Sequence, residues 1–420
     1  MVVFRKTRDF AHKLFPYKVV LTADDTKVAR DYIAAYWSRL ERFHPKDDES
    51  QLGLPKPYLV PAFEEGHEFD FNELYYWDSY FMVQGLLDKN HKELTLGILE
   101  NLVHMFERFK IIPNASRTYL MGRSQPPFLT SLIFDLYDTY KMDKRWLKRV
   151  ISVAEAEYNM VWMGTTKPNA RQVYQGLSRY YDINYLNDLA EAESGWDMNP
   201  RFGRQALHFL PVDLNTLLYK YEMDFSRAAE IFGDESKVLE WQEKAATRKS
   251  VMDKLMWNDL KGMYFDFDYT KEKRGTVNSL AAYYALWTGM ADEQQAARLV
   301  KSLKRFEVRG GVATTDAPIL SKFVPGNLPM QWAYPNGWAP LHFIVVEGLE
   351  RYGYHQEARR IALKWLKTNL DWFNAHGVFL EKYNVASPGN PPARGVYPSL
   401  TGFGWTNAVF EHFCQKYIDK

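Results

Sequence analysis

Two short segments place a carboxylate where it could do acid–base chemistry. In the first, with sequence ESGWD, Trp196 directly precedes Asp197. A neighbouring Trp can hold a carboxyl group in a poorly hydrated place, which raises its pKa and makes it a usable proton donor. The alternative is that Asp197 caps a helix ahead of the MNPRF segment that follows it.

The second segment, FLEKYN, carries Glu381 between Gly377 and a loop rich in Pro and Gly. A carboxylate in this setting could act as the general base that activates a water molecule. The alternative is a surface ion pair between Glu381 and Lys382. Neither segment decides between these interpretations by itself.

Several loops combine Trp with Asp, Asn, Gln, Gly or Pro, a composition that suits sugar recognition. Sugar hydroxyls need directional donors and acceptors, and the apolar faces of sugar rings need aromatic rings. Aromatic residues make up 16% of the chain, which fits either a large core or a cleft that stacks sugar rings. The candidate binding residues from these loops are Trp77, Asp78, Asn114, Arg123, Gln125, Gln331, Trp332, Asn336 and Trp338.

Other chemistries find no support in the sequence. It has no GxSxG, HExxH or P-loop pattern and no GxGxxG after a strand. The single cysteine, Cys414, excludes an internal disulfide and a Cys-based zinc site, and its pattern predicts an inert thiol on the apolar face of a terminal helix. We therefore expect no cofactor and no metal.

The charge balance and the hydropathy of the sequence limit the classes of molecule that the protein is expected to bind. With 53 Lys and Arg against 52 Asp and Glu, the net charge of +1 argues against a nucleic-acid or membrane partner. The N-terminus lacks the apolar core of a signal peptide, and no stretch approaches the roughly 20 apolar residues of a membrane span. We expect a cytoplasmic protein that binds a small carbohydrate, as a monomer or small homo-oligomer.

The apolar residues recur with the helical period through most of the chain. No linker divides it, so we expect one all-α domain over residues 1–420, with residues 1–66 as a peripheral N-terminal segment of helix and loop. Gly262–Tyr269 could form short strands, which we expect to build no sheet. The predicted helices are Val28–Phe43, Lys92–Phe109, Phe128–Tyr140, Trp146–Val161, Asp213–Ile231, Ser236–Leu255, Thr276–Trp287, Ala291–Leu303, Ala339–Tyr352, His355–Leu370 and Gly404–Ile418.

The sequence resembles the trehalase family of glycoside hydrolases, and the similarity spans roughly residues 70–415. Six stretches match family motifs in the family's order, and Trp196 and Trp405 within them join the predicted binding residues. The resemblance implies an (α/α)6 toroid of six inner and six outer helices with a cleft at one end. The matching stretches are NELYYWDSYFMVQGLL, IIPNASRTYLMGRSQPPFLT, ESGWD, QWAYPNGWAPLHFIVVEGL, FLEKYN and GFGWTNAVF.

The resemblance also assigns roles. It makes Asp197 the general acid and Glu381 the general base of an inverting reaction, with the two carboxyl groups about 6.5–9.5 Å apart. By the same matching, the subsite for the released glucose is lined by Phe71, Trp77, Asp78, Asn114, Arg123 and Trp332.

The chain departs from the family around the second sugar. Asp70 stands in place of an arginine, Ala333 in place of the Asp of QWD, and Val396 in place of the Glu of Glu-Tyr-Pro. A downstream Arg-Pro-Glu-Ser stretch is absent, and Arg179 or Arg394 are the candidates to replace it. These differences predict an altered leaving-group subsite, with weaker trehalose hydrolysis or a different preferred leaving group.

The function expected from the sequence is therefore an inverting, metal-independent α-glycosidase acting on a small α-glucoside, with trehalose the foremost substrate. Another glucobiose, glucosylglycerate or mannosylglycerate are alternative substrates. A degenerate, non-hydrolytic carbohydrate-binding protein and a transferase or lyase on the same toroid are the other classes.

Overall fold

The helical period of the sequence is seen directly in α4 (Lys92–Phe109), where Ile98, Leu102 and Met105 are fully buried on one face. The helix ends where Lys110 takes a left-handed conformation, with φ 58°. The structure, a computed structural model, describes residues 19–63, 71–318, 330–393, 395 and 400–419.

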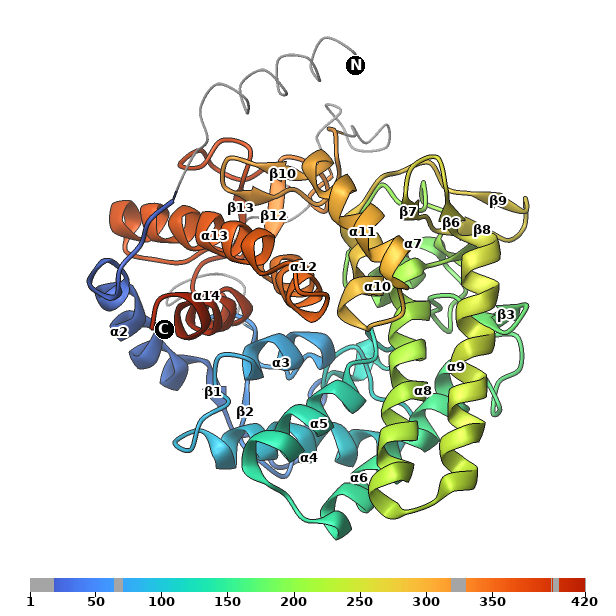
Figure 1. Ribbon diagram of the computed structural model, residues 1–420. Helices are drawn as coiled ribbons and strands as arrows, with labels where there is room; N and C mark the ends of the chain where they lie inside the picture. The colour runs from blue at the N-terminus through green and yellow to red at the C-terminus, as the bar shows by residue number, and fades with distance from the viewer. Residues whose placement is uncertain (1–18, 64–70, 319–329, 394, 396–399, 420) are drawn as a thin grey trace.

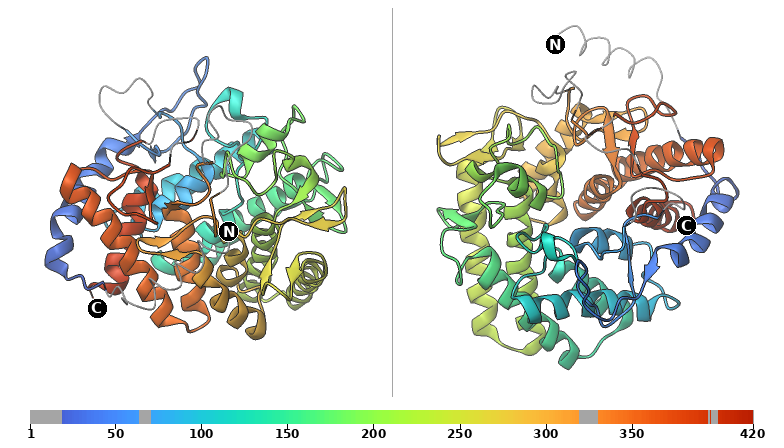
Figure 2. Two further views of the ribbon diagram at one scale, coloured as in Figure 1. Left: turned by 90° about the horizontal axis from the view of Figure 1, so that it is seen from above. Right: turned by 180° about the vertical axis from the view of Figure 1, so that it is seen from behind.

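The helices form a closed ring in which outer and inner helices alternate along the chain (Figure 1; Figure 2, right). This is the (α/α)6 toroid expected from the sequence, and the all-α prediction is confirmed. The outer helices are α2 (Ala23–Leu40), α4, α6 (Lys144–Glu157), α9 (Glu235–Leu255), α11 (Glu293–Ser302) and α13 (His355–His376), and the inner helices are α3 (Tyr76–Val83), α5 (Leu129–Tyr140), α8 (Val212–Phe232), α10 (Tyr284–Trp287), α12 (Ala339–Arg351) and α14 (Gly404–Tyr417).

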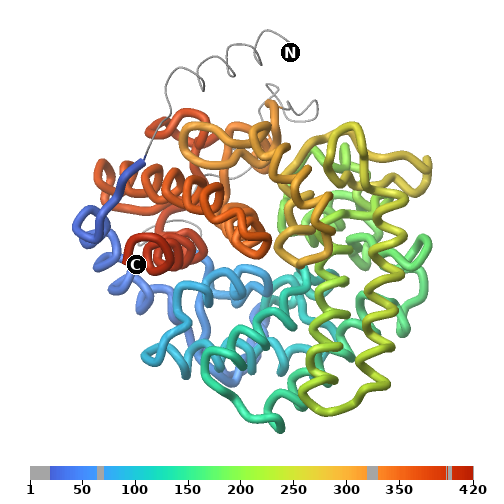
Figure 3. The backbone as a smooth tube through the Cα atoms, viewed as in Figure 1, coloured from blue at the N-terminus to red at the C-terminus, as the bar shows by residue number. Residues whose placement is uncertain are grey.

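The ring closes because helices far apart in the sequence pack together. The last inner helix, α14, packs against the first inner helix, α3, and against α2. Figure 3 shows the chain passing round the ring, so that blue α2 and red α14 lie side by side. Every residue of α3 is buried, whereas α9 buries four of its residues, Trp241, Ala245, Arg248 and Met252, and exposes most of the rest.

Two helices of the described chain were not predicted. Because α3 is buried on all sides, it lacks the one-sided apolar stripe on which the periodicity argument depends. The other, α7 (Asn187–Glu193), has seven residues and is too short to show a period. The predicted helix Thr276–Trp287 is wrong in its first part, since 3-10 turns (η4, Leu280–Tyr283) precede α10 and residues 276–278 are not helical.

Short antiparallel strands brace the connecting loops. The expectation that Gly262–Tyr269 builds no sheet is wrong, because β8 pairs with strands on both sides in a three-stranded sheet whose member β5 is distant in sequence. The pairs are β1 (Glu41–Arg42) with β2 (Tyr58–Leu59), β3 (Gln172–Tyr174) with β4 (Leu177–Ser178), β6 (Trp257–Asn258) with β7 (Met263–Tyr264), β10 (Glu307–Val308) with β11 (Gly311–Val312), β12 (Asn336–Trp338) with β13 (Lys382–Asn384), and the sheet β5 (Phe209–Leu210), β8 (Phe267–Asp268), β9 (Lys273–Arg274).

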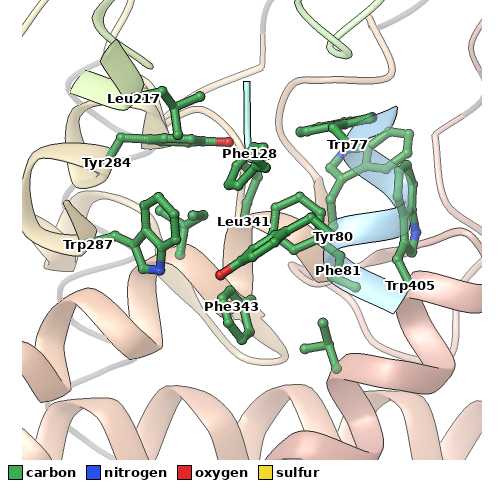
Figure 4. Close-up of a cluster of buried hydrophobic side chains, with 14 of the residues drawn as sticks. Trp77, Tyr80, Phe81, Phe128, Leu217, Tyr284, Trp287, Leu341, Phe343 and Trp405 are labelled. Carbon is green, nitrogen blue, oxygen red and sulfur yellow. The ribbon is translucent and has the colours of Figure 1, made fainter. Parts of the chain in front are cut away.

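Aromatic side chains fill the middle of the ring (Figure 4). Tyr80 stacks on Phe128 with ring centroids 4.6 Å apart, and Phe81 meets Phe343 edge to face. Cys414 is fully buried on α14, as its pattern predicted. Over the described ranges, no helix combines the length and apolar character needed to cross a bilayer. The division into one domain with a peripheral segment at residues 1–66 stays a prediction.

Candidate active site

A single pocket of about 580 Å³ is built by the loops that precede inner helices. These loops lead into α3, α5, α8, α12 and α14, so the N-terminal ends of these five inner helices face one end of the ring. The volume is within the range of about 300–1,000 Å³ typical of small-molecule sites. The described lining residues are Pro61, Phe71, Tyr75, Trp77, Asp78, Asn114, Tyr119, Leu120, Arg123, Gln125, Ala192, Gly195, Asp197, Trp332, Glu381, Leu400, Phe403 and Trp405.

Asp197 enters this pocket from the loop after α7. No helix begins at Asp197 in the described chain, so the helix-cap alternative is wrong. Gly195 turns the chain with φ 70°, and a Cβ atom there would lie 2.5 Å from the Trp77 ring. Glu193, at the end of α7, accepts hydrogen bonds from the backbone N–H groups of Ser124 and Tyr181, each at 2.7 Å. The general-acid candidate therefore sits on a loop tied to neighbouring walls of the pocket.

Glu381 reaches the pocket from the loop between α13 and α14. Its backbone N–H donates to the carbonyl of Leu400, and its own carbonyl accepts from the indole N–H of Trp405, both at 3.0 Å. The Nζ atom of Lys382 lies 2.5 Å from Oε2 of Glu381. The ion pair of the alternative interpretation exists, but Lys382 is 0% exposed and Glu381 3% exposed, so it is not a surface pair.

Burial raises the pKa values of two pocket carboxyls. The pKa of Asp197 rises to about 6, first because the carboxyl is removed from water and second because the charge of Glu381 lies near. Burial raises the pKa of Asp78 to about 8, and the charges of Glu381 and Asp197 add to that rise. With a pKa of about 6, Asp197 holds a proton in weakly acidic solution, and a protonated carboxyl beside an ion-paired Glu381 is the arrangement that acid–base catalysis on an acetal requires.

Directional polar groups line the same pocket. Asn114 Nδ2 donates to the carbonyl of Ser124 at 3.1 Å, and Gln125 Oε1 accepts from the backbone N–H of Trp77 at 2.9 Å. Arg123 pairs with Asp182 at 3.2 Å, and its buried Nε–H has no partner among the described residues. These groups are held in place and can offer hydrogen bonds to a ligand.

Stacked tryptophans form one wall. Trp332 lies face to face on Trp338, with ring centroids 3.7 Å apart and an interplanar angle of 2°. Trp77 and Trp405 meet edge to face, with their centroids 5.8 Å apart. Rigid indole faces of this kind suit the apolar faces of a sugar ring.

Four of the predicted binding residues do not line the described pocket. Trp196 and Trp338 are fully buried, and each stacks on the ring of Trp332, which lines the cavity. Gln331 donates to the backbone carbonyl of Asp197 at 3.1 Å. Asn336 donates to the carbonyls of Gln331 and Ala393. They brace the binding loops because their polar groups are used within the protein.

The structure brings the other ten predicted residues together at the cavity: Asp197, Glu381, Phe71, Trp77, Asp78, Asn114, Arg123, Gln125, Trp332 and Trp405. Their roles stay predictions. The sequence analysis missed the remaining lining residues, which are mostly apolar. Some of them could have been found because they lie next to or within a motif: Tyr75 precedes YWD, and Phe403 lies in GFGW.

The structure describes two of the five residues on which the predicted change of the leaving-group subsite depends, Ala333 and Arg179. Asp70, Val396 and Arg394 lie outside the described residues. Ala333 is fully buried and is not among the described lining residues. Arg179 donates to the backbone carbonyls of Ala170 and Leu207 and to the hydroxyl of Tyr269, and it is likewise not among the described lining residues.

No group of three or more His, Cys, Asp or Glu side chains suited to a metal ion occurs among the described residues.

Comparisons with known proteins point to one family. A family model described as Trehalase matches residues 6–194 and 182–418. A cytosolic neutral trehalase from Beauveria bassiana is 32% identical over 445 residues, which cover 86% of this chain and 58% of that protein. A periplasmic trehalase from Escherichia coli O1:K1 / APEC is 30% identical over 427 residues, covering 90% of this chain and 72% of that protein.

A solved structure of neutral trehalase from Saccharomyces cerevisiae superposes with a TM-score of 0.75 at 28% identity, covering 92% of this chain and 79% of that one. The chain spans less than two thirds of the length of some curated relatives, 58% for the Beauveria protein. Because these relatives include cytosolic and periplasmic proteins, the cytoplasmic location of this chain stays a prediction.

Proposed function

This chain belongs to the trehalase family, and we propose that it is an inverting α-glycosidase that hydrolyses trehalose to glucose. The observation that carries the proposal is the pair of carboxyl groups, Asp197 and Glu381, on one pocket lined by tryptophans. Burial favours the protonated form of Asp197, and the ion pair with Lys382 favours the ionised form of Glu381.

In the proposed reaction, Asp197 donates its proton to the oxygen of the glycosidic bond as the C–O bond breaks. Glu381 takes a proton from a water molecule, whose oxygen attacks the anomeric carbon from the opposite face. A water between base and sugar requires carboxyl groups about 6.5–9.5 Å apart. An oxocarbenium-like transition state then collapses to a glucose of inverted configuration and a second glucose that keeps its own.

Trp77 and Trp332 supply ring faces for the glucose being released, and Asn114 and Gln125 supply amide groups. The unpartnered Nε–H of Arg123 is a further donor for a sugar hydroxyl. A protonated Asp78 would act as donor as well as acceptor, because its pKa of about 8 exceeds neutral pH.

The experiment follows the products of trehalose hydrolysis by proton NMR in the first minutes. Inversion releases one β-glucose and one α-glucose per trehalose, before the anomers equilibrate. Retention would release two α-glucose molecules and would contradict the mechanism. Glucosylglycerate, mannosylglycerate and other glucobioses are tested in parallel, because the leaving group is the least determined part of the substrate.

Two variants test the roles of the carboxyls. Asp197→Asn and Glu381→Gln should each lower kcat by roughly 10²–10⁴-fold while substrate binding changes little. The matched controls are Asp188→Asn, an exposed carboxyl on α7, and Glu243→Gln, an exposed carboxyl on α9, both expected to keep wild-type kcat. Near-full activity of either pocket variant would remove that residue from the mechanism.

A further inference from the structure

Lys382 is a fully buried cation that the reaction proposed above does not use. Its ammonium group lies 2.5 Å from Oε2 of Glu381, and none of its surface is exposed. A buried ammonium is costly unless it is paired. Glu381 supplies that partner, and the effect of the pair on Glu381 then matters for the reaction.

The fold holds this lysine in a fixed place. Strand β13 pairs with β12 so that Lys382 lies opposite Trp338. The Nζ atom sits 5.0 Å from the centroid of the Trp338 ring, within the range of a cation–π interaction. Trp338 in turn stacks on Trp332, which lines the pocket. The position of the charge is therefore set by the same tryptophan stack that shapes the site.

Within the part of the chain that the structure describes, the charged groups that face Glu381 come from three elements. Asp78 from α3 and Asp197 from the loop after α7 bring carboxyls, and Lys382 on β13 brings the positive charge. From α14, the neutral donors Trp405 and Thr406 bond to the backbone carbonyls of Glu381 and Leu380, respectively. Three carboxyls on one pocket compete for protons, and a cation beside one of them decides which ionises first.

We infer that Lys382 is a positioning residue whose ammonium keeps Glu381 ionised and oriented as the base while Asp197 retains its proton. This inference rests on the proposed function, since it concerns the base of that reaction. Inversion needs opposite protonation states on two carboxyls that share one pocket. Burial disfavours the ionised form of both carboxyls. Lys382 contacts Glu381 directly and favours its ionised form, so the two carboxyls can hold opposite protonation states.

The direction of the expected effect follows from the charges. An opposite charge within about 4–6 Å lowers a carboxyl pKa by about 1–3 units. Without Lys382, Glu381 would take up a proton at higher pH than before. The pKa of Asp197 would rise as well, because Lys382 lowers it in the wild-type protein. Both limbs of the pH profile of kcat/KM should then move to higher pH, the limb of the base by more.

The test compares Lys382→Met, which keeps the length of the side chain without its charge, with Lys382→Arg, which keeps the charge. In Lys382→Met the acid limb should move up by about 1–3 pH units, so activity at low pH falls about 10–10³-fold, with KM nearly unchanged. Lys382→Arg should keep the limb near its wild-type place. Lys416 lies on the last turn of α14 and pairs with Glu347, outside the pocket. Lys416→Met should therefore leave the pH profile unchanged.

A loss of activity that is equal at every pH would overturn the inference, because a merely structural role has no reason to move one limb. The double variant Glu381→Gln with Lys382→Met removes both charges and shows whether the charge-free site still folds. Circular dichroism and thermal unfolding of each variant identify any that fail to fold.

A second readout does not depend on hydrolysis. In infrared difference spectra at pH 6, Lys382→Met should show an additional protonated carboxyl band, beyond those that Asp78 and Asp197 already give in the wild type, and the double variant should lose it. Absence of that band in a folded Lys382→Met protein would refute the inference. If the wild type does not hydrolyse trehalose, the proposed function fails, and the band still reports whether Lys382 keeps Glu381 ionised.

Discussion

Replacing Gly195 by alanine tests how tightly the loop of Asp197 is held against the tryptophan wall. Two costs are expected. The first is backbone strain, since Gly195 has φ 70°, where a side chain costs about 1–2 kcal/mol. The second is a clash, since the new Cβ would lie 2.5 Å from Cε2 and 2.7 Å from Cζ2 of Trp77.

Trp77 cannot easily move away. It is 1% exposed, and Phe81, Trp332 and Trp405 surround its ring with centroids 5.6–5.8 Å away. Overpacking of this kind costs about 1–3 kcal/mol, so the total destabilisation of Gly195→Ala should be about 2–5 kcal/mol. A displacement of about 1 Å at the catalytic groups should also lower kcat/KM by roughly 10²-fold.

Gly203→Ala is the matched control, because Gly203 has φ 54° and a Cβ there would meet nothing within 4 Å. It should cost only the backbone strain, about 1–2 kcal/mol, and leave kcat/KM unchanged. The assays are equilibrium unfolding in guanidinium chloride and initial rates on trehalose. If Gly195→Ala matched Gly203→Ala in both, the close contact between this loop and Trp77 would be refuted.

Four further predictions concern the protonation of Asp197, metal removal and the support of its loop. Because Asp197, the proposed acid, can donate a proton only in its protonated form, kcat/KM should fall as pH rises through about 6. The pKa of Asp197 in the folded protein lies above its ordinary value of 3.8, so its contribution to stability is full below pH 3.8 and is lost as pH rises through about 6. Asp197→Asn should therefore gain thermal stability relative to wild type between pH 4 and pH 7. Dialysis against EDTA should leave the rate unchanged, because an acid and a base suffice for acetal cleavage, and a loss that a divalent ion restores would contradict this. Glu193→Gln should cost about 3–5 kcal/mol of unfolding free energy, because it breaks a buried ion pair with Arg171. The control Asp188→Asn breaks an exposed pair with Arg204 and should cost less than about 1 kcal/mol. Equal costs for the two variants would show that the Glu193 contacts add no stability.

Local information in the chain was enough for the long amphipathic helices and for ten of the residues that meet at the pocket. The bounds of α4 agree with the predicted Lys92–Phe109, because one apolar stripe and a charged opposite face set that helix alone. Asp197 and Glu381 could be singled out because each lies in a short segment of unusual composition, and the order of the motifs implied the toroid. These features depend on residues a few positions apart.

The tertiary structure decided what depends on residues far apart in the sequence. Lys382 and Glu381 could equally have formed a surface pair, and only the packing of β13 against β12 buries them together. Trp332 and Trp338 lie in one segment of the sequence, QWAYPNGWAP, yet Trp332 lines the pocket, whereas Trp338 is buried against the Trp332 ring and is not among the lining residues. Burial sets pKa values and access to ligand, and burial is a property of the whole ring rather than of any segment, which is why the sequence alone could not assign it.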